Sequence, residues 1–290
     1  MKDYLVRGIV ESKNCRVFAC RTTNLLEHAR ASHDMWPTAS AALGRMMSVT
    51  LMMGAMNKNK EKMTVTINGG GPIGTLIAST NSDGKIKGFV SDPHCHFTYN
   101  DSGKLAVGYA VGKEGTIQVI RDMGLKEPFV GTCPLYSGEI GDDFAAYFNI
   151  SDQTPSVVSV GVLVNDTNEI LASGGFIIQL LPDATEEDIA YIEDTLNGFP
   201  AVSYLINSGK SPEDILKMIF DDVTILDTQD LFFECDCSKE RMKEALMTVG
   251  AKDIQEIIDE DHGCEMTCHF CNTHYSFSEE ELKQLLEELQ

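Results

Sequence analysis

The sequence predicts an α+β fold in three parts: a mixed N-terminal core over residues 1–181, a helical acidic linker over 182–231 and a small C-terminal domain over 232–290. Short β-branched runs with a period near two dominate the first part, and the period changes to about 3.6 from Asp183 onward. Most of the acidic charge also follows Asp183. The strands and helices of the core alternate without a regular βαβ rhythm, which favours the α+β class.

The N-terminal core is expected to contain short strands separated by Gly, Asn and Asp, together with three helices. The helix at 38–56 contains Arg45 and has small residues and Met on several faces, which is typical of a helix buried against a sheet and not of a membrane span. The strands are expected at residues 5–10, 16–20, 63–67, 75–79, 85–90, 105–111, 116–120, 157–164 and 170–179, and the helices at 25–32, 38–56 and 139–148.

Capping signals mark the helices that follow Asp183. Thr185 precedes three acidic residues and opens a helix that ends near Gly198, and Ser211 followed by Pro212 opens another. Ser278 begins the last helix with a capping box. The remaining expected elements are a strand at 224–233, helices at 238–248, 251–260 and 279–289, and a turn at 267–271.

The net charge of −21 is unevenly distributed. Residues 1–182 have a net charge of −1, residues 183–234 of −11 and residues 235–290 of −9. A like-charged segment repels itself, so its compact state is less stable. The acidic balance argues against binding to the phosphate backbone of nucleic acids.

The first residues lack the apolar run of a signal peptide, so a cytoplasmic location is expected. The chain has 9 cysteines. In a reducing compartment they indicate metal binding, redox activity or simple burial, and not a disulfide scaffold.

Four cysteines form two close pairs, Cys235-Asp236-Cys237 and Cys268-His269-Phe270-Cys271, separated by 30 residues. Residues i and i+2 of an extended segment point to the same side, so the first pair can offer two thiolates to one ion. The second pair has the spacing of a common zinc half-site. The helices between the pairs can return the chain as a hairpin. We therefore predict one Zn²⁺ per chain in a closed, tetrahedral, non-hydrolytic site of four thiolates.

The metal would also stabilise a domain too small to fold well alone, because structural zinc supplies on the order of 10–16 kcal/mol in zinc-finger peptides. The same four thiolates are the oxidisable form of sulfur. A disulfide across Cys235-Asp236-Cys237 would close a tight, strained loop that is easily reduced again. The spacing alone leaves two interpretations open: a structural zinc ribbon that keeps its metal, and a reversible redox sensor.

The sequence resembles the family of 33 kDa heat-shock chaperonins, the redox-regulated bacterial holdases, over essentially its whole length. The matching segments are ECDCS at 234–238, TCHFCN at 267–272 with Tyr275-Ser276-Phe277, and YSGEIGDDF at 136–144 continuing to SDQTPS at 151–156. The last segment lies far from the cysteines and has no role in a generic zinc ribbon.

The resemblance implies a chaperone of the stress response, and not an enzyme, that binds unfolded or oxidatively damaged client proteins without ATP. The reduced, zinc-bound form would be inactive. Oxidation would form the Cys235–Cys237 and Cys268–Cys271 disulfides, release zinc, unfold the linker and the zinc domain, and promote homodimers. The core domain would then bind clients and form the dimer.

Other cysteines and histidines are less suited to bind the metal than these four cysteines. Cys264 departs from the family pattern and lies four residues before Cys268, so it could compete as a ligand or form a wrong disulfide on oxidation. We interpret it as a free thiol near the site. Four cysteines already complete the shell, so further histidines nearby are expected at the surface or behind the ligands. These are His262, His269 and His274. The triplet His94-Cys95-His96 has no further ligands nearby, and Cys15, Cys20 and Cys133 are expected to be buried, inert thiols.

Two other functions agree less well with the sequence. A thioredoxin-like oxidoreductase would use Cys268 and Cys271 as a dithiol, but its motif would follow a strand of a βαβ unit. A zinc-ribbon nucleic-acid binder is opposed by the acidic charge of residues 235–290. The glycine-rich stretch at 69–74 lacks the Lys-Ser/Thr of a phosphate-binding loop, so we interpret it as turn glycines.

Overall fold

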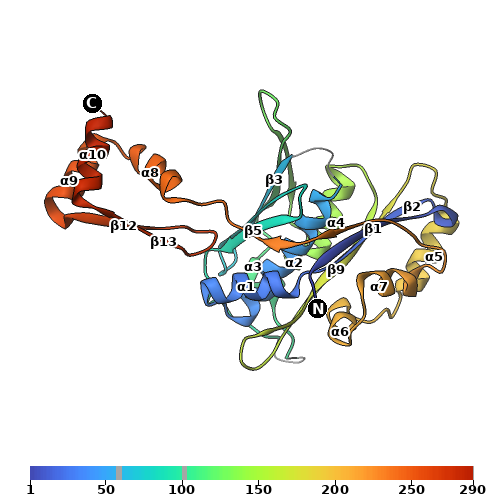
Figure 1. Ribbon diagram of the computed structural model, residues 1–290. Helices are drawn as coiled ribbons and strands as arrows, with labels where there is room; N and C mark the ends of the chain where they lie inside the picture. Colours follow the sequence, from blue (N-terminus) through green and yellow to red (C-terminus); the bar gives the residue numbers. More distant parts are fainter. Residues whose placement is uncertain (57–60, 100–102, 290) are drawn as a thin grey trace. The chain divides into compact units, whose positions relative to one another are not determined.

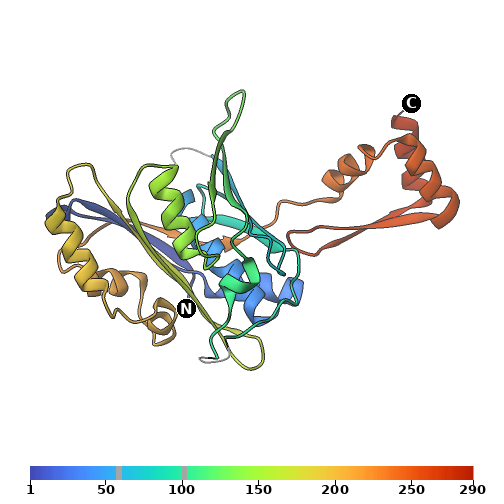
Figure 2. The ribbon, with the colours of Figure 1, turned by 180° about the vertical axis from the view of Figure 1, so that it is seen from behind.

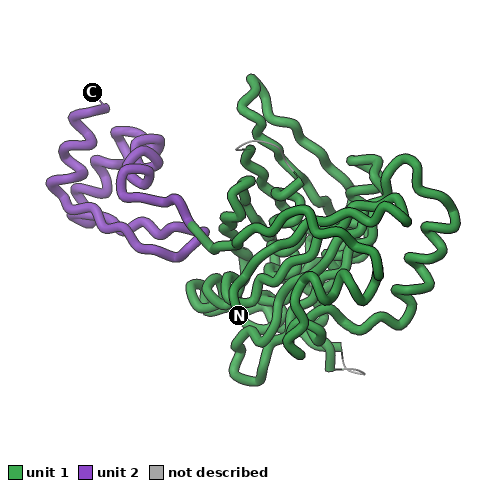
Figure 3. The backbone as a smooth tube through the Cα atoms, turned by 45° about the vertical axis from the view of Figure 1, so that its right-hand side comes forward, with its two compact units in different colours: residues 1–234 green, residues 235–290 purple. Residues whose placement is uncertain are grey.

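Two β-sheets with helices between them form the larger part of the structure, a computed structural model that describes residues 1–56, 61–99 and 103–289. The chain divides into two units, Met1–Glu234 and Cys235–Gln290 (Figure 3). The mixture of sheets and helices confirms the predicted α+β class.

The five-stranded sheet has the order β10-β1-β2-β9-β8 and the six-stranded sheet the order β11-β5-β4-β3-β6-β7. Neighbouring strands are antiparallel except for β11 and β5, which are parallel. The five-stranded sheet contains β1 (Tyr4–Val10), β2 (Cys15–Arg21), β8 (Ser156–Val164), β9 (Ile170–Leu180) and β10 (Thr224–Asp230). The six-stranded sheet contains β3 (Lys62–Asn68), β4 (Thr75–Asn81), β5 (Lys85–Val90), β6 (Thr116–Asp122), β7 (Phe129–Pro134) and β11 (Phe232–Phe233).

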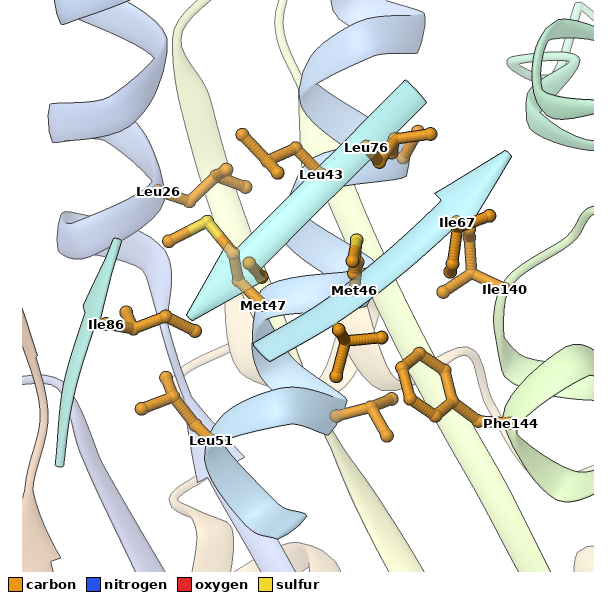
Figure 4. Packing of buried hydrophobic residues seen from close by; sticks show 14 of the residues in the cluster. Leu26, Leu43, Met46, Met47, Leu51, Ile67, Leu76, Ile86, Ile140 and Phe144 are labelled. Atoms are coloured by element: carbon orange, nitrogen blue, oxygen red, sulfur yellow. The ribbon is translucent and has the colours of Figure 1, made fainter. Parts of the chain in front are cut away.

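Helix α2 (Pro37–Gly54) lies between the two sheets and contacts strands of both (Figure 1). It is buried on nearly every face, as predicted from its small residues and methionines. Met46 and Met47 point into the cluster formed with strand residues such as Ile67 and Leu76 (Figure 4). Helices α1 (Thr23–His33) and α4 (Gly141–Ile150) also contact both sheets. Within the described ranges, none of the helices combines the length and apolarity that a bilayer span requires.

Three helices of the acidic segment cover the other face of the five-stranded sheet. They are α5 (Glu186–Leu196), α6 (Val202–Asn207) and α7 (Pro212–Ile219), and in both views they run along β1, β2 and β9 (Figures 1 and 2). Their buried apolar residues join those of the sheet in a second cluster. The predicted helix starts are confirmed: Thr185 and Asp188 form a capping box on α5, and Ser211 and Asp214 form one on α7. Helix α6 was not predicted.

The segment expected as one strand at 224–233 is two strands in different sheets. Strand β10 pairs with β1, and β11 pairs with β5. Leu231, between them, is buried in the core cluster. The acidic segment therefore contributes an edge strand to each sheet.

The expected strand at 105–111 is wrong. Residues 107–111 form a short helix, α3 (Val107–Val111), and Leu105 makes only an isolated bridge to Thr98. The buried residues Val107, Ala110 and Val111 have the i, i+3, i+4 spacing of a helix. The glycine-rich stretch packs against this helix: the Gly71 amide donates to the Val111 carbonyl at 3.0 Å, and a Cβ on Gly71 would lie 2.3 Å from the Ala110 carbonyl oxygen. The two backbones approach so closely that a Cβ atom would not fit, which explains why glycine occurs in this stretch.

The YSGEIGDDF segment builds a tight turn before α4. The buried Asp143 carboxylate accepts hydrogen bonds from the backbone amides of Tyr136, Ser137, Gly138 and Ile140, at 2.7–3.2 Å. Ile140 is held at φ 69° and ψ −57°, an unfavourable conformation for a β-branched residue. The carboxylate thereby gives partners to four backbone amides of the turn, of which those of Gly138 and Ile140 are buried. Helix α4 accordingly begins two residues after the expected start. Strand β7 was not predicted.

The described part of the second unit consists of three helices and one β-hairpin. Its helices are α8 (Lys239–Met247), α9 (Ala251–Asp261) and α10 (Glu279–Glu288), and its strands are β12 (Gly263–Thr267) and β13 (His274–Ser278). Six residues form its buried cluster: Leu246, Ile254, Ile258, Phe277, Leu282 and Leu285. The three helices and the Ser278 capping box were predicted, and the two strands were not.

Candidate metal centre

Four sulfur atoms converge in the second unit. The Sγ atoms of Cys235, Cys237, Cys268 and Cys271 all lie within 4.8 Å of one another. The Cys235 and Cys268 sulfurs are 3.7 Å apart, and the Cys237 and Cys271 sulfurs are 3.3 Å apart. Four sulfurs bound at about 2.3 Å to a tetrahedral zinc ion lie roughly 3.8 Å from one another. The donor set and its spacing thus fit such an ion.

Local structure at each half-site positions these sulfurs. The segment Cys235-Asp236-Cys237 precedes α8, whose first turn is capped by the Ser238 side chain. Cys268 and Cys271 lie in the turn between β12 and β13. That turn is closed by the Asn272 amide, which donates to the Cys268 carbonyl at 2.8 Å, and by the Cys268 amide, which donates to the Thr273 carbonyl at 2.9 Å. The turn of the β-hairpin thereby holds both thiols of this half-site in place.

The sulfurs accept hydrogen bonds from several donors. The Cys237 amide donates to the Cys235 sulfur, and the amides of Phe270 and Cys271 donate to the Cys268 sulfur. Side-chain hydroxyls serve the other two: Thr273 Oγ1 lies 3.2 Å from the Cys271 sulfur, and Tyr275 Oη donates to the Cys237 sulfur at 3.1 Å. These donors stabilise thiolates, the form that binds metal. Sequence reasoning assigned no role to Thr273 or Tyr275, although both lie just after the second half-site.

The pKa values of the thiols follow from burial and from these contacts. Burial raises the pKa of Cys235 and of Cys268. Burial also opposes ionisation of Cys271, but hydrogen bonds from the hydroxyl and amide of Thr273 and from the thiols of Cys237 and Cys268 together lower the pKa of Cys271 to about 7. Protons must leave the other sulfurs for all four to bind one ion, so metal affinity should increase with pH.

Two of the three histidines near the site lie close to carboxylates. His262 Nδ1 lies 3.2 Å from Glu279, and His274 Nδ1 lies 2.9 Å from Glu265. Among the described residues, the group suited to a metal consists of the four cysteines and no histidine. All nine cysteines are free in the structure.

Cys264 lies on β12, opposite Phe277, and packs against the apolar cluster of the second unit. Burial raises its pKa. It is outside the group of four sulfurs. It is a half-buried thiol and not a fifth ligand.

The cysteines and histidines of the first unit form no comparable group among the described residues. Cys15, Cys20, Cys95 and Cys133 are buried, and burial raises the pKa of each. His94 Nε2 lies 3.4 Å from Asp34, whereas His96 Nδ1 lies 3.3 Å from the Thr38 hydroxyl. The two histidines of the triplet thus contact different partners.

Comparisons with known proteins cover the whole chain. The Hsp33 protein family profile matches residues 3–278. The chain is 46% identical to the 33 kDa chaperonin of Bacillus cytotoxicus over 291 aligned positions, covering 100% of both chains, and 48% identical to that of Bacillus velezensis, covering 99% of both. The crystal structure of the Thermotoga maritima 33 kDa chaperonin matches with a TM-score of 0.93 and 34% identity over 99% of each chain. The chain therefore belongs to the Hsp33 family of 33 kDa chaperonins, which are chaperones and not enzymes.

Proposed function

We propose that this protein is an ATP-independent holdase that oxidation switches on. The convergence of four cysteine sulfurs within a small acidic unit is the observation that supports the proposal most directly. In the reduced state the protein would bind one Zn²⁺ and be inactive. In the oxidised state it would form homodimers in the cytoplasm and bind unfolded or oxidatively damaged proteins, without nucleic acid or ATP.

Zinc is the proposed ion because four thiolates around one tetrahedral centre suit it. Cys235, Cys237, Cys268 and Cys271 would hold it. A bound zinc ion would keep these sulfurs as thiolates and supply folding free energy on the order of 10–16 kcal/mol. The second unit depends on such a supplement, since its buried cluster has six residues and its net charge is −9.

Peroxide is the proposed oxidant, and the family resemblance implies a disulfide within each half-site. One thiolate attacks a peroxide oxygen, the O–O bond breaks and hydroxide leaves, which gives a sulfenic acid. The second thiolate attacks that sulfur, the S–O bond breaks and a second hydroxide leaves. Each pair of thiolates loses two electrons and one peroxide gains two. With its ligands consumed in the Cys235–Cys237 and Cys268–Cys271 disulfides, the site no longer binds metal.

Loss of the metal is proposed to unfold residues 232–290 and then the acidic linker at 182–231, leaving residues 1–181 as the client-binding and dimerising domain. The linker covers apolar surface of the first unit: Ile192, Leu205 and Ile215 pack in one cluster with Val17, Phe176 and Ile178 of the five-stranded sheet. Unfolding of α5, α6 and α7 would expose that face of the sheet. Exposed apolar surface of this kind can hold unfolding proteins.

Light scattering of a thermally unfolding client tests the proposal. Reduced, zinc-loaded protein and peroxide-treated protein are compared without ATP, and only the treated protein should suppress scattering. The Cys264→Ser variant, which keeps all four ligands, should switch like the parent protein. The Cys268→Ser variant, which lacks one ligand, should suppress scattering with less dependence on peroxide treatment. Equal suppression by both forms would reject redox control, and suppression by neither would leave a structural zinc domain as the remaining interpretation.

Limited proteolysis tests the proposed domains. Peroxide-treated protein should be cleaved within residues 183–234, the segment expected to open after metal loss. Cleavage mainly within residues 1–180 would contradict the proposed order of unfolding.

A further inference from the structure

The donors to the four sulfurs differ in where they come from. Three sulfurs accept hydrogen bonds from backbone amides that lie within their own half-site or two residues beyond it. The Cys237 amide donates to Cys235, those of Phe270 and Cys271 donate to Cys268, and that of Thr273 donates to Cys271. Cys237 receives the hydroxyl of Tyr275, which is 38 residues away in the sequence. This hydrogen bond joins the first half-site to the hairpin that carries the second.

The fold of the second unit holds Tyr275 in place. Tyr275 lies on β13 and pairs with Met266 of β12, and its half-buried ring packs against the apolar cluster. The ring is thus anchored on the hairpin while the hydroxyl reaches the Cys237 sulfur at 3.1 Å. Substitution by Phe would remove the hydroxyl and keep the packing of the ring.

A hydroxyl that donates to a thiolate lowers the energy of the sulfur lone pairs. A sulfur with stabilised lone pairs is a weaker nucleophile towards peroxide. Groups that hydrogen-bond to metal ligands also orient them, and removing one commonly lowers metal affinity about 10- to 100-fold.

We propose that Tyr275 is a positioning residue that holds Cys237 in the metal site and slows oxidation of its thiolate. The hydroxyl thereby slows the opening of the centre at a given peroxide concentration. This inference rests on the proposed function, since it requires a bound metal and oxidation by peroxide. The chemical step is the attack of the Cys237 thiolate on peroxide described above, with hydroxide as the leaving group.

The test compares full-length Tyr275→Phe with Ser276→Ala. Ser276 is the neighbouring exposed hydroxyl on β13, and successive strand side chains point to opposite faces, so its removal leaves the sulfurs untouched. Zinc release after peroxide addition is followed with a chromogenic chelator, and zinc affinity is measured by competition. Tyr275→Phe should bind zinc about 10-fold more weakly and release it faster, and Ser276→Ala should match the parent protein.

A second measurement separates the hydrogen bond from any loss of folding. In Co²⁺-substituted protein, the thiolate-to-cobalt charge-transfer band should move to longer wavelength in Tyr275→Phe, because the sulfur lone pairs are no longer stabilised. A band, affinity and release rate equal to those of the parent protein would overturn the role of Tyr275. Failure of the parent protein to release zinc with peroxide would instead reject the proposed redox function, so the two failures are distinguishable.

Discussion

Residues 183–234 and 235–290 have similar net charges but are stabilised by different parts of the structure. Both are acidic, with net charges of −11 and −9. The first segment is built into the larger unit: its helices cover the five-stranded sheet, and its strands β10 and β11 pair with β1 and β5. The second forms a unit of its own, with a cluster of six buried residues and four converging sulfurs.

This difference indicates two sources of stability for segments that repel themselves. The first segment gains from apolar surface and backbone hydrogen bonds supplied by a large neighbour. The second has little apolar surface to bury, so we expect it to depend on a metal. Removing zinc should therefore unfold residues 235–290 before residues 183–234. Weakening the contacts with the five-stranded sheet should instead unfold residues 183–234 before residues 235–290.

Removal of zinc is expected to have the largest effect. A strong chelator should unfold residues 235–290, because the lost contribution is on the order of 10–16 kcal/mol. Hydrogen exchange on the full-length reduced protein would locate the change, with strands β2, β3 and β9 remaining protected. Cys264→Ser, which has the same four ligands, should respond to the chelator as the parent protein does. Persistent protection of α9 and α10 after chelation would show that the small core suffices without metal.

A matched pair of core substitutions compares the two segments directly. Leu216 on α7 and Leu282 on α10 are both fully buried. Each Leu→Ala substitution should cost about 2–5 kcal/mol, measured by urea unfolding of the zinc-loaded protein. Leu216→Ala should destabilise the segment that covers the five-stranded sheet and leave zinc affinity unchanged. Leu282→Ala should weaken zinc binding, because folding and metal binding are coupled there. Equal effects on zinc affinity would contradict the separation of the two segments.

Two capping serines provide a smaller test of the same comparison. The Ser211 hydroxyl accepts from the Asp214 amide at 3.1 Å, and the Ser278 hydroxyl accepts from the Glu281 amide at 3.3 Å. Replacing either serine with Ala should cost about 1 kcal/mol. Hydrogen exchange should show faster opening of α7 in Ser211→Ala and of α10 in Ser278→Ala. An effect of either substitution on the other helix would indicate coupling between the two segments in the reduced protein.

Acid should weaken the part of the α7 capping box that depends on the ionised Asp214 carboxylate. The backbone and side chain of Ser211 hydrogen-bond to Asp214 and lower the pKa of this carboxyl below its ordinary value of 3.8. A lowered pKa in the folded state adds stability above the ordinary pKa, and that stability is lost as the pH falls through the lowered value. The stability difference between the parent protein and Ser211→Ala should therefore be constant near pH 7 and shrink below about pH 3.8. Stability titrations of the two proteins at equal salt concentration would measure it.

Local signals in the sequence were sufficient to predict several features of the chain. Capping by Thr185, Ser211 and Ser278 depends on residues within one turn, so its chemistry is visible in the sequence. The buried α2 follows from its own small residues and methionines. The spacing of the four cysteines indicated which sulfurs could gather, because two short half-sites separated by 30 residues can bind one ion together.

Features that depend on distant partners came only from the tertiary structure. The pairing of β10 with β1 and of β11 with β5 joins residues more than 140 positions apart, and no local pattern specifies such partners. The close contact between α3 and the backbone of the glycine-rich stretch also joins segments that are distant in the sequence. The contact of Tyr275 with Cys237 likewise exists only after the hairpin has folded. Local chemistry determines where helices begin and which atoms can bind a metal, whereas the arrangement of the whole chain decides which strands pair and which hydroxyl reaches a sulfur.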